Sequence, residues 1–333
     1  MKRLRVAQIG TSETTHAVQT FRAMVNQPDL FEVVAYADVD RHTHDVFDDF
    51  KPFPCMTPDE LLEIPGLDAV AIECDEVLLT KYALMAAEKG LAIHMDKPGS
   101  EPQDEYDRLI DIIEEKNLVF QTGYMYRYNP AVEYAMQAVK DGKLGHVYAV
   151  ETHMDCWHKP AMRRWFKTFR GGMMFYLGCH LTDLIVNFMG LPDEVLAMNS
   201  PCTAEIPDAN DYGMAILKYP TGVSFAKACA VEAGGFLRRQ LVICGDKGRI
   251  EIRPLERSVG LDILECDMRE CYADENGESS WNDDGVITTF GPFHRYEPMM
   301  ADFAAMVRGE KTNPWTPEYE RKLHEVVRKT CGF

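Results

Sequence analysis

The stretch "DAVAIECDEVLLTKYALMAAEKGLAIHMDKPGS", residues 68–100, decides the fold. The apolar runs at residues 68–74 and 91–96 predict two buried strands. Residues 77–90 lie between them, carry apolar side chains at helical spacing and end at Gly90, which is typical of a helix terminus. A strand, a helix and a second strand in this order predict a parallel crossover.

The chain on either side repeats this alternation. Further strands are expected at residues 4–10, 31–39 and 118–125, and helices at residues 15–27, 57–64 and 101–117. Thr57 and Glu60 have the spacing of a capping box at the start of the short helix. The fold class expected for residues 1–122 is therefore α/β, a Rossmann-like doubly wound parallel sheet of the kind that usually serves as a dinucleotide-binding domain.

The pattern changes after about residue 145. A strand is expected at residues 146–154 and an apolar helix at residues 171–190, followed by strand pairs at residues 214–231 and 240–254 with turn residues at their centres. Residues 318–330 predict a terminal helix. Residues 123–333 are thus expected to form an α+β domain with a large open, mainly antiparallel sheet.

Composition limits the possible partners. The 333 residues are 46% hydrophobic and 26% charged, which is typical of a soluble protein of two domains. The formal net charge of −18 argues against nucleic acid and anionic membranes as partners. No apolar run is long enough for a membrane span and no signal-type segment begins the chain. The ten cysteines form no CxxC pair, so we expect free thiols in a reducing cytoplasm.

Lys97 follows a buried strand directly and precedes Pro98. Lysine prefers water, so one interpretation is a solvated loop. The other is an ammonium group positioned at the mouth of a cleft, where partial desolvation lowers the pKa of a lysine and suits it to proton exchange.

The first loop, "GTSETT" at residues 10–15, keeps only Gly10 of the dinucleotide fingerprint G-x-G-x-x-G. The hydroxyls of Ser12 and Thr15 could donate to phosphate, but Glu13 adds a negative charge there. A nucleotide site and a plain strand–helix turn both remain open. Asp38 ends the second strand, where a carboxylate can accept ribose hydroxyls and repel a 2′-phosphate, which favours NAD over NADP. The alternative for Asp38 is a solvated acid at a strand end.

Three motifs resemble the Gfo/Idh/MocA family, the glucose–fructose oxidoreductase and inositol dehydrogenase group. "GLAIHMDKP" at residues 90–98 is similar to the family's E-K-P segment, with Asp96 for the usual Glu. "GYMYRYNPAV" at residues 123–132 is similar to the segment after the last nucleotide-domain strand. "GGMMFYLGCHLTDLI" at residues 171–185 is similar to the family's glycine-rich entry into its catalytic helix.

The resemblance implies an NAD-dependent oxidoreductase acting on a secondary hydroxyl or carbonyl of a sugar, polyol or derivative. It implies that Lys97 hydrogen-bonds the reacting hydroxyl and that His180 takes its proton. Tyr176 stands where the family has an acid, and becomes a third catalytic candidate. The family's open sheet usually supports oligomers, so a homodimer or homotetramer is expected.

The same resemblance places further residues at the site, and Lys97, His180 and Tyr176 recur among them. The expected cofactor-binding residues are Gly10, Thr11, Ser12, Asp38, Cys74, Asp96, Lys97 and Gln121. The expected substrate-binding residues are Tyr124, Arg127, Trp157, Arg164, Trp165, Tyr176, His180 and Asp183. Four positions of the helix motif, at residues 176, 179, 180 and 183, share one face of a regular helix.

Departures from the family pattern leave two alternative functions open. "CDEVLL" at residues 74–79 replaces the usual T-P-N-x-x-H and adds Asp75 and Glu76 near the expected phosphates. The acidic loops support a sugar-binding protein that has lost its dinucleotide. A third possibility is an enzyme with tightly held NAD that oxidises, eliminates a neighbouring group and reduces back.

Two further features of the second half bear on ligands. The basic, aromatic segment at residues 156–172 favours an anionic carbohydrate, such as a uronate or sugar phosphate, or else lies along an acidic neighbour. His153, Asp155 and His158 could ligate a metal in part, as could His180 with Asp183, but no metal is expected.

Overall fold

The structure is a computed structural model that describes residues 2–41 and 45–333. The chain forms two compact units. The first comprises Met1–Met125 with Tyr296–His324, and the second comprises Tyr126–Arg295 with Glu325–Phe333. The division expected after residue 122 does not anticipate the return of residues 296–324 to the first unit.

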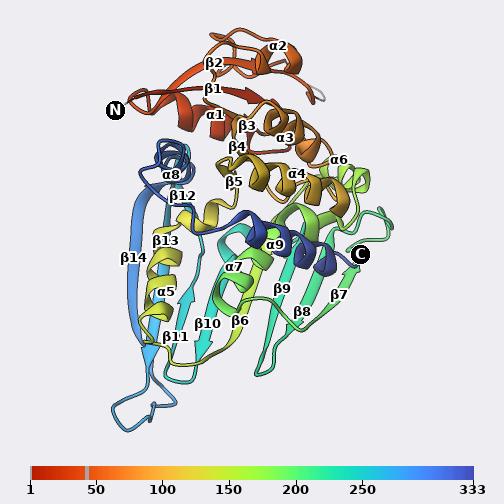
Figure 1. The fold of residues 1–333 in the computed structure, drawn as a ribbon. Coiled ribbons are helices and arrows are strands. Elements are labelled where there is room, and N and C mark those ends of the chain that lie inside the picture. Colours follow the sequence, from red (N-terminus) through yellow and green to blue (C-terminus); the bar gives the residue numbers. More distant parts are fainter. Residues whose placement is uncertain (1, 42–44) are drawn as a thin grey trace. The chain divides into compact units, whose positions relative to one another are not determined.

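The first unit is built on a five-stranded parallel sheet of order β2-β1-β3-β4-β5 (Figure 1). Its strands are β1 (Leu4–Ile9), β2 (Phe31–Ala37), β3 (Ala69–Ile72), β4 (Ala92–Met95) and β5 (Phe120–Thr122). Its helices are α1 (Ala17–Val25), α2 (Pro58–Leu62), α3 (Leu79–Glu88), α4 (Gln103–Lys116) and α8 (Glu297–Val307). The Rossmann-like doubly wound sheet is thereby confirmed.

Local signals determine several of these elements as expected. The capping box of α2 is present, because the Glu60 amide donates to the Thr57 hydroxyl and the Thr57 amide donates to the Glu60 carboxylate. The strand order reverses direction between β1 and β3. In open α/β sheets, ligands bind outside the carboxyl ends of the strands at such a switch point.

Helix α8 closes the first unit from a distant part of the sequence. It packs against α1, and its first residue Glu297 accepts a hydrogen bond from Asn26 through its side chain and from Gln27 through its carbonyl oxygen. Helix α9 (Pro317–Thr330) follows and contributes residues to both units. The helix expected at residues 318–330 is confirmed.

The second unit is built on a nine-stranded sheet of order β12-β13-β11-β10-β6-β9-β8-β7, with β14 paired to β13. Every neighbouring pair is antiparallel except β6 and β9, which run parallel. The strands are β6 (Val147–Asp155), β7 (Glu194–Ser200), β8 (Tyr212–Lys218), β9 (Val223–Cys229), β10 (Gln240–Gly245), β11 (Gly248–Ile252), β12 (Arg257–Gly260), β13 (Ile263–Tyr272) and β14 (Val286–His294). The large, mainly antiparallel sheet is confirmed.

Helices cover one face of this sheet (Figure 1). Helix α7 (Cys179–Met189) packs on β6 and β9, and α5 (Pro130–Lys140) packs on β11, β13 and β14. The short α6 (Pro160–Trp165) precedes α7. Alternate residues of β6, β8 and β9 are buried under the helices, as expected for a sheet with one covered face.

The expected helix at residues 171–190 is interrupted. Residues Met174–Gly178 form a π-type turn, and the regular helix begins only at Cys179. A Cβ on Gly178 would lie 2.7 Å from the Met174 sulfur, so glycine permits this tight local packing. The wider turn changes the angular position of Tyr176 relative to His180, so the regular-helix face expected for residues 176–183 holds only from Cys179 onward.

Candidate functional site

The candidate site residues of the first unit gather at the carboxyl ends of its parallel strands. Gly10 follows β1 with a φ of +111°, and a Cβ there would lie 2.5 Å from the backbone of Glu73 and Cys74. Only glycine fits this position, because both the backbone angle and the space exclude a side chain. Gly10 therefore brings the loop after β1 against the loop after β3.

Hydroxyl groups join these two loops at the switch point. The Ser12 and Thr14 hydroxyls donate to the same Asp75 carboxylate oxygen, at 2.8 and 3.0 Å. The Thr15 hydroxyl donates to the Glu73 carbonyl oxygen at 3.0 Å. The hydroxyls that were expected to face phosphate thus have acceptors within the protein.

Asp40, a residue that sequence reasoning missed, holds the same region together. Its two carboxylate oxygens accept the backbone amides of Thr11 at 2.9 Å and of Asp75 at 2.7 Å. Asp40 belongs to the segment after β2, and its side chain is buried. Its spacing two residues after Asp38 was the only signal available in the sequence.

Asp38 lies at the end of β2, as expected. One oxygen accepts the Thr11 hydroxyl at 2.8 Å, and the other lies 3.0 Å from the Arg41 guanidinium. A carboxylate in this place fits the hydroxyls of an adenosine ribose. The first unit therefore fits a dinucleotide at Gly10 and Asp38, whereas a bound pyrophosphate would lie near the negative charges of Asp40 and Asp75.

Lys97 is not on a solvated loop. Its side chain is 1% exposed, and its ammonium lies 3.8 Å from the carboxylate of Glu76, which is also 1% exposed. Its backbone amide donates to the Asp96 carboxylate at 2.8 Å, and His16 lies 3.3 Å from the same carboxylate oxygen. The strand end thus carries a buried ammonium beside one acid, Glu76, while a second acid, Asp96, binds the Lys97 backbone.

These two acids have opposite protonation behaviour. Burial raises the pKa of Glu76 to about 8, although the charge of Lys97 opposes the increase. Burial also acts on Asp96, but the positive charges of Lys97 and His16 and their hydrogen bonds outweigh it and lower its pKa to about 2. Asp96 is therefore ionised at neutral pH, while Glu76 largely keeps its proton.

A buried polar chain lies behind Asp96. The His94 ring nitrogens lie 3.0 Å from the Glu73 carboxylate and 2.8 Å from the Gln121 amide oxygen. The Gln121 amide nitrogen donates to the Met299 carbonyl oxygen at 3.2 Å. Burial and the charge of Asp96 raise the pKa of Glu73, and His94 opposes the rise. Sequence reasoning assigned Gln121 to the cofactor and missed Glu73 and His94, although a histidine inside an apolar strand was a signal.

Two other expected residues of the first unit are enclosed. The Cys74 side chain is fully buried, and burial raises the pKa of its thiol well above the ordinary range. Tyr124, assigned to the substrate, is buried after β5. Gly123 beside it is close-packed, because a Cβ there would lie 3.1 Å from the Asp96 carboxylate.

In the second unit, helix α7 presents His180 and Asp183. The His180 ring packs edge-on against Tyr126, with ring centroids 5.1 Å apart. Asp183 forms a buried, two-pronged ion pair with Arg127 at 2.7–3.1 Å and also accepts from the Asn187 amide at 2.9 Å. Arg127 and Asp183, both assigned to the substrate, are thus partners of each other.

Tyr126 is fixed by a buried charge network. Its hydroxyl donates to the Glu256 carboxylate at 2.6 Å, and Arg239 donates to the same oxygen at 2.5 Å. Arg295 binds the other oxygen of Glu256. Burial and the Glu256 charge raise the pKa of Tyr126. The network orients the ring that packs against His180.

Tyr176 belongs to an aromatic cluster. Its ring centroid lies 5.3 Å from Phe166, 5.5 Å from Trp165 and 6.2 Å from His158. Trp157, by contrast, is 66% exposed. The structure thus brings Trp165 and Tyr176 together, while Trp157 offers an open aromatic face.

The basic segment of the second unit lies along acidic residues of the segment between β7 and β8. Arg163 pairs with Asp211 at 2.5 Å, Lys167 with Asp208 at 2.5 Å, and Arg164 with Glu205 at 3.8 Å. The Arg163 pair is buried, and the other two are exposed. The acidic neighbour considered in the sequence is therefore present.

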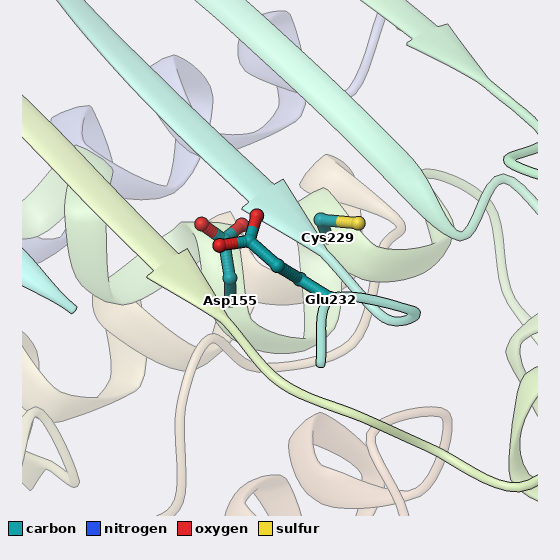
Figure 2. A group of neighbouring side chains, drawn as sticks. All are labelled: Asp155, Cys229 and Glu232. Atoms are coloured by element: carbon teal, nitrogen blue, oxygen red, sulfur yellow. The ribbon is translucent and has the colours of Figure 1, made fainter. Parts of the chain in front are cut away.

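Among the described residues, one group has the spacing of a metal site: Asp155, Cys229 and Glu232. Figure 2 shows the two carboxylates side by side and the Cys229 thiol directed away from them. The Lys227 ammonium lies 2.9 Å from Asp155 and 2.8 Å from Glu232. This ammonium supplies the positive charge between the carboxylates, so the group carries no metal assignment.

A parallel sheet with a glycine-restricted first loop and a strand-end carboxylate is typical of the class of dinucleotide-binding proteins. The comparison of family sequences agrees with this class. Residues 4–124 match the oxidoreductase family with an NAD-binding Rossmann fold, and residues 132–251 match the GFO/IDH/MocA C-terminal domain. The chain belongs to the Gfo/Idh/MocA oxidoreductase family, and the resemblance seen in the motifs is confirmed.

Curated relatives are similar over part of their length. Levoglucosan dehydrogenase of Pseudarthrobacter phenanthrenivorans is 26% identical over 44% of this chain and 39% of its own. D-xylose 1-dehydrogenase (NADP(+)) 2 of Haloferax volcanii is 27% identical over 49% of this chain and 50% of its own. A 2,7-anhydro-N-acetylneuraminate hydratase of Escherichia coli is 22% identical over 62% of this chain and 56% of its own. The matches thus span about two fifths to just over half of these relatives.

Solved structures share the fold over nearly the whole chain. A 3-ketoreductase of Actinomadura kijaniata, solved with NADP and TDP-benzene, matches with a TM-score of 0.79 at 17% identity, covering 98% of this chain and 96% of its own. This likeness supports the fold. Within the described part of the chain, no helix is both long enough and apolar enough to cross a bilayer.

Proposed function

We propose that the chain is an NAD-dependent oxidoreductase that oxidises or reduces a secondary hydroxyl or carbonyl of a sugar, polyol or sugar derivative. The observation that carries this proposal is Lys97 at the carboxyl edge of a Rossmann sheet: its buried ammonium lies beside Glu76, and its backbone amide donates to Asp96. The names of the similar dehydrogenases, which act on levoglucosan and D-xylose, support the substrate class.

NAD is proposed over NADP because of Asp38. Its carboxylate, together with Gly10, Thr11 and Ser12, would hold the adenosine end of the cofactor, and its charge would repel a 2′-phosphate. When bound, the nicotinamide dinucleotide supplies the acceptor or donor of a hydride. Cys74, Asp96 and Gln121 remain proposed cofactor-side residues, and of these Asp96 also fixes the backbone of Lys97.

The proton chemistry is assigned to Lys97 and His180. The Lys97 Nζ would hydrogen-bond the substrate oxygen and exchange its proton, with Glu76 3.8 Å away as the nearby acid. His180 is proposed as a proton acceptor whose ring is oriented by Tyr126. Tyr176 is proposed as a phenol donor within its aromatic cluster.

The substrate contacts are proposed from residue chemistry. Trp157 and Trp165 offer aromatic faces for the C–H face of a sugar, whereas Tyr124 is 1% exposed and offers none. Arg164 would add a charged contact to an anionic sugar, because its pair with Glu205 is exposed and therefore weak. The buried pair of Arg127 and Asp183 would act by supporting the helix that carries His180.

A second candidate is supported by the relative named as a hydratase. In this variant the chain holds NAD tightly, oxidises its substrate transiently, eliminates a neighbouring group and reduces the product. Net dehydrogenation would then be absent although the cofactor is required. The candidates share Lys97 and differ only in whether reduced cofactor accumulates.

Two broader proposals accompany the function. A homodimer or homotetramer is proposed because, in the described part of the chain, helices cover only one face of the second sheet, and light scattering at micromolar concentration tests it. A reducing cytoplasm is proposed because all ten cysteines are free thiols in the structure.

The deciding experiment is dinucleotide binding. The purified protein is denatured and the supernatant assayed for NAD(H), and stripped protein is titrated with NADH and NADPH by fluorescence. Bound NAD(H), or micromolar affinity for NADH, supports the proposal, and a panel of polyols, sugars and uronates then separates the two candidates. Folded protein that neither releases nor binds either dinucleotide would refute it and favour a sugar-binding protein without cofactor.

A further inference from the structure

Two cysteine side chains of the second unit lie next to each other. The sulfur atoms of Cys202 and Cys229 are 3.7 Å apart. Cys229 is the last residue of β9, and Cys202 belongs to the segment that joins β7 to β8. From this contact we propose that Cys202 and Cys229 form a reversible disulfide when the protein meets a hydroperoxide or a small-molecule disulfide.

The geometry requires only a small movement. A disulfide brings its sulfurs to about 2.05 Å, so the two atoms must approach by about 1.7 Å. Cys202 lies outside the strands, so its displacement breaks no ladder hydrogen bond of the sheet. Its contacts are to Asp211, whose carboxylate accepts the Cys202 amide at 2.5 Å and whose carbonyl oxygen lies 3.5 Å from the thiol.

Access is unequal between the two thiols. Cys202 is half-buried and Cys229 is buried. The hydrogen bond from the Cys202 thiol lowers the pKa of Cys229 to about 7 and raises the pKa of Cys202, so Cys229 carries the thiolate. Cys202, the more accessible of the two, is then positioned as the resolving thiol, which is the arrangement typical of reversible thiol oxidation.

The reaction balances with a hydroperoxide as the two-electron oxidant. The Cys229 thiolate attacks the peroxide O–O bond, releases water or an alcohol, and becomes a sulfenic acid. The Cys202 sulfur then displaces the hydroxyl group as water, which leaves one S–S bond. A dithiol reductant reverses the step by thiol–disulfide exchange.

A third thiol makes the proposal specific. Cys156 also lies near Cys229, but its sulfur contacts the Cys229 carbonyl oxygen, at 3.7 Å, rather than the Cys229 sulfur. A random oxidation of neighbouring thiols would include Cys156. The contact between sulfurs predicts that Cys229 pairs with Cys202 instead.

The disulfide would also restrain the segment between β7 and β8. The segment between β7 and β8 carries Glu205, Asp208 and Asp211, which pair with the basic segment at residues 156–172. A covalent tie from Cys202 to β9 would fix this acidic segment to the sheet. The proposal does not depend on any bound cofactor or substrate.

The experiment uses the full chain without reductant. Protein is treated with hydrogen peroxide or with a small-molecule disulfide, free thiols are alkylated, and the digest is mapped by mass spectrometry. Cys202→Ser and Cys229→Ser are the test variants, and Cys244→Ser is the matched control, because Cys244 is a half-buried cysteine of the same sheet, on β10, which β6 separates from β9. Native mass and thermal unfolding accompany each sample.

The expected result is one linked peptide pair containing Cys202 and Cys229, whose mass is two hydrogens below that of the two reduced peptides. Dithiothreitol should break the link and return both free thiols. The link persists in Cys244→Ser and disappears in both test variants, and the linked protein unfolds at a higher temperature than the reduced one. A link between Cys156 and Cys229, or oxidation of Cys229 to sulfinic acid without a link, would overturn the proposal. If a variant does not fold, peptide mapping of the oxidised wild-type protein alone shows whether Cys202 is linked to Cys229.

Discussion

The ammonium of Lys97 lies 3.8 Å from the carboxylate of Glu76, and both side chains are almost completely buried. Glu76 stands within "CDEVLL", the segment that resembles the family's T-P-N-x-x-H pattern, at the position of its Asn. Removing Lys97 would remove the charge that lowers the pKa of Glu76, so Glu76 would hold its proton more firmly.

Replacing Lys97 by methionine should lower kcat by about 10²–10⁴-fold, because a positioned proton-transfer group contributes about that factor. NADH affinity should change little. Steady-state kinetics on the first active substrate measures the effect. Lys81→Met, an exposed lysine on α3, serves as control. A Lys97→Met variant with wild-type kcat would remove Lys97 from the chemistry.

Glu76 predicts a pH dependence of stability. Its carboxyl titrates near 4.5 when unfolded and near 8 when folded. Between these values the folded state binds more protons, so the free energy of unfolding falls as the pH rises from about 4.5 to 8. The slope is roughly 1.4 kcal/mol for each pH unit in this window. Glu76→Gln should flatten this dependence.

Urea denaturation of Glu76→Gln at pH 5.5, 7 and 8.5 tests this point against wild type, with the exposed Glu88→Gln as control. Parallel curves for wild type and Glu76→Gln would show that Glu76 ionises at its ordinary pKa. The Asp96 pKa of about 2 adds a separate loss of stability only at much lower pH, because its folded-state pKa is depressed.

Asp38→Ser should shift cofactor preference from NADH toward NADPH by about tenfold or more. The change removes the charge that repels a 2′-phosphate and releases Arg41 from its 3.0 Å pair, so that Arg41 can bind that phosphate. The ratio of the two dissociation constants is the measurement. Asp29→Ser is the control, because Asp29 lies in the turn before β2, away from the carboxyl ends of the strands. An unchanged ratio in Asp38→Ser would contradict the role of Asp38.

Asp75→Asn should tighten dinucleotide binding about fivefold. The amide keeps an acceptor for the Ser12 and Thr14 hydroxyls and removes one negative charge near the expected pyrophosphate. Fluorescence titration at two salt concentrations measures it, because the gain should shrink as salt screens the charge. Equal affinities at low salt would place the pyrophosphate elsewhere.

Asp183→Asn should destabilise the fold by about 3–5 kcal/mol, because it leaves the buried Arg127 without its charged partner. The double variant with Arg127→Met should recover part of this loss. Chemical denaturation of both variants is the measurement. If the single variant costs under about 1 kcal/mol, the pair carries no structural role.

Local sequence patterns were enough to predict the first sheet and two hairpins of the second sheet. The capping box of α2 and the hairpins β8–β9 and β10–β11 depend on neighbouring residues, so they were predictable. Strand β14 was not, because its residues are mostly exposed and include Gly291 and Pro292; its strand character comes from pairing with β13. The π-type turn before α7 was missed because its residues favour a regular helix locally.

The positions of the candidate site residues were more predictable than their contacts. Motifs fix Lys97, Asp38 and Gly10 along the chain, so their places after β4, β2 and β1 could be predicted. Asp40 and the chain from Glu73 through His94 to Gln121 were missed, since their roles come from hydrogen bonds between separate strands. The pairing of Arg127 with Asp183 likewise depends on contacts 56 positions apart.

The packing of α8 on α1 has a consequence for how the protein is made. The first unit needs residues up to His324, so it remains incomplete until that part of the chain has left the ribosome. The second unit's sheet is synthesised while the first waits for its last helices. A gene fragment that stops near residue 122 would therefore yield a Rossmann sheet with an uncovered α1. To express the two units separately, the chain would have to be divided at three points, after residues 125, 295 and 324.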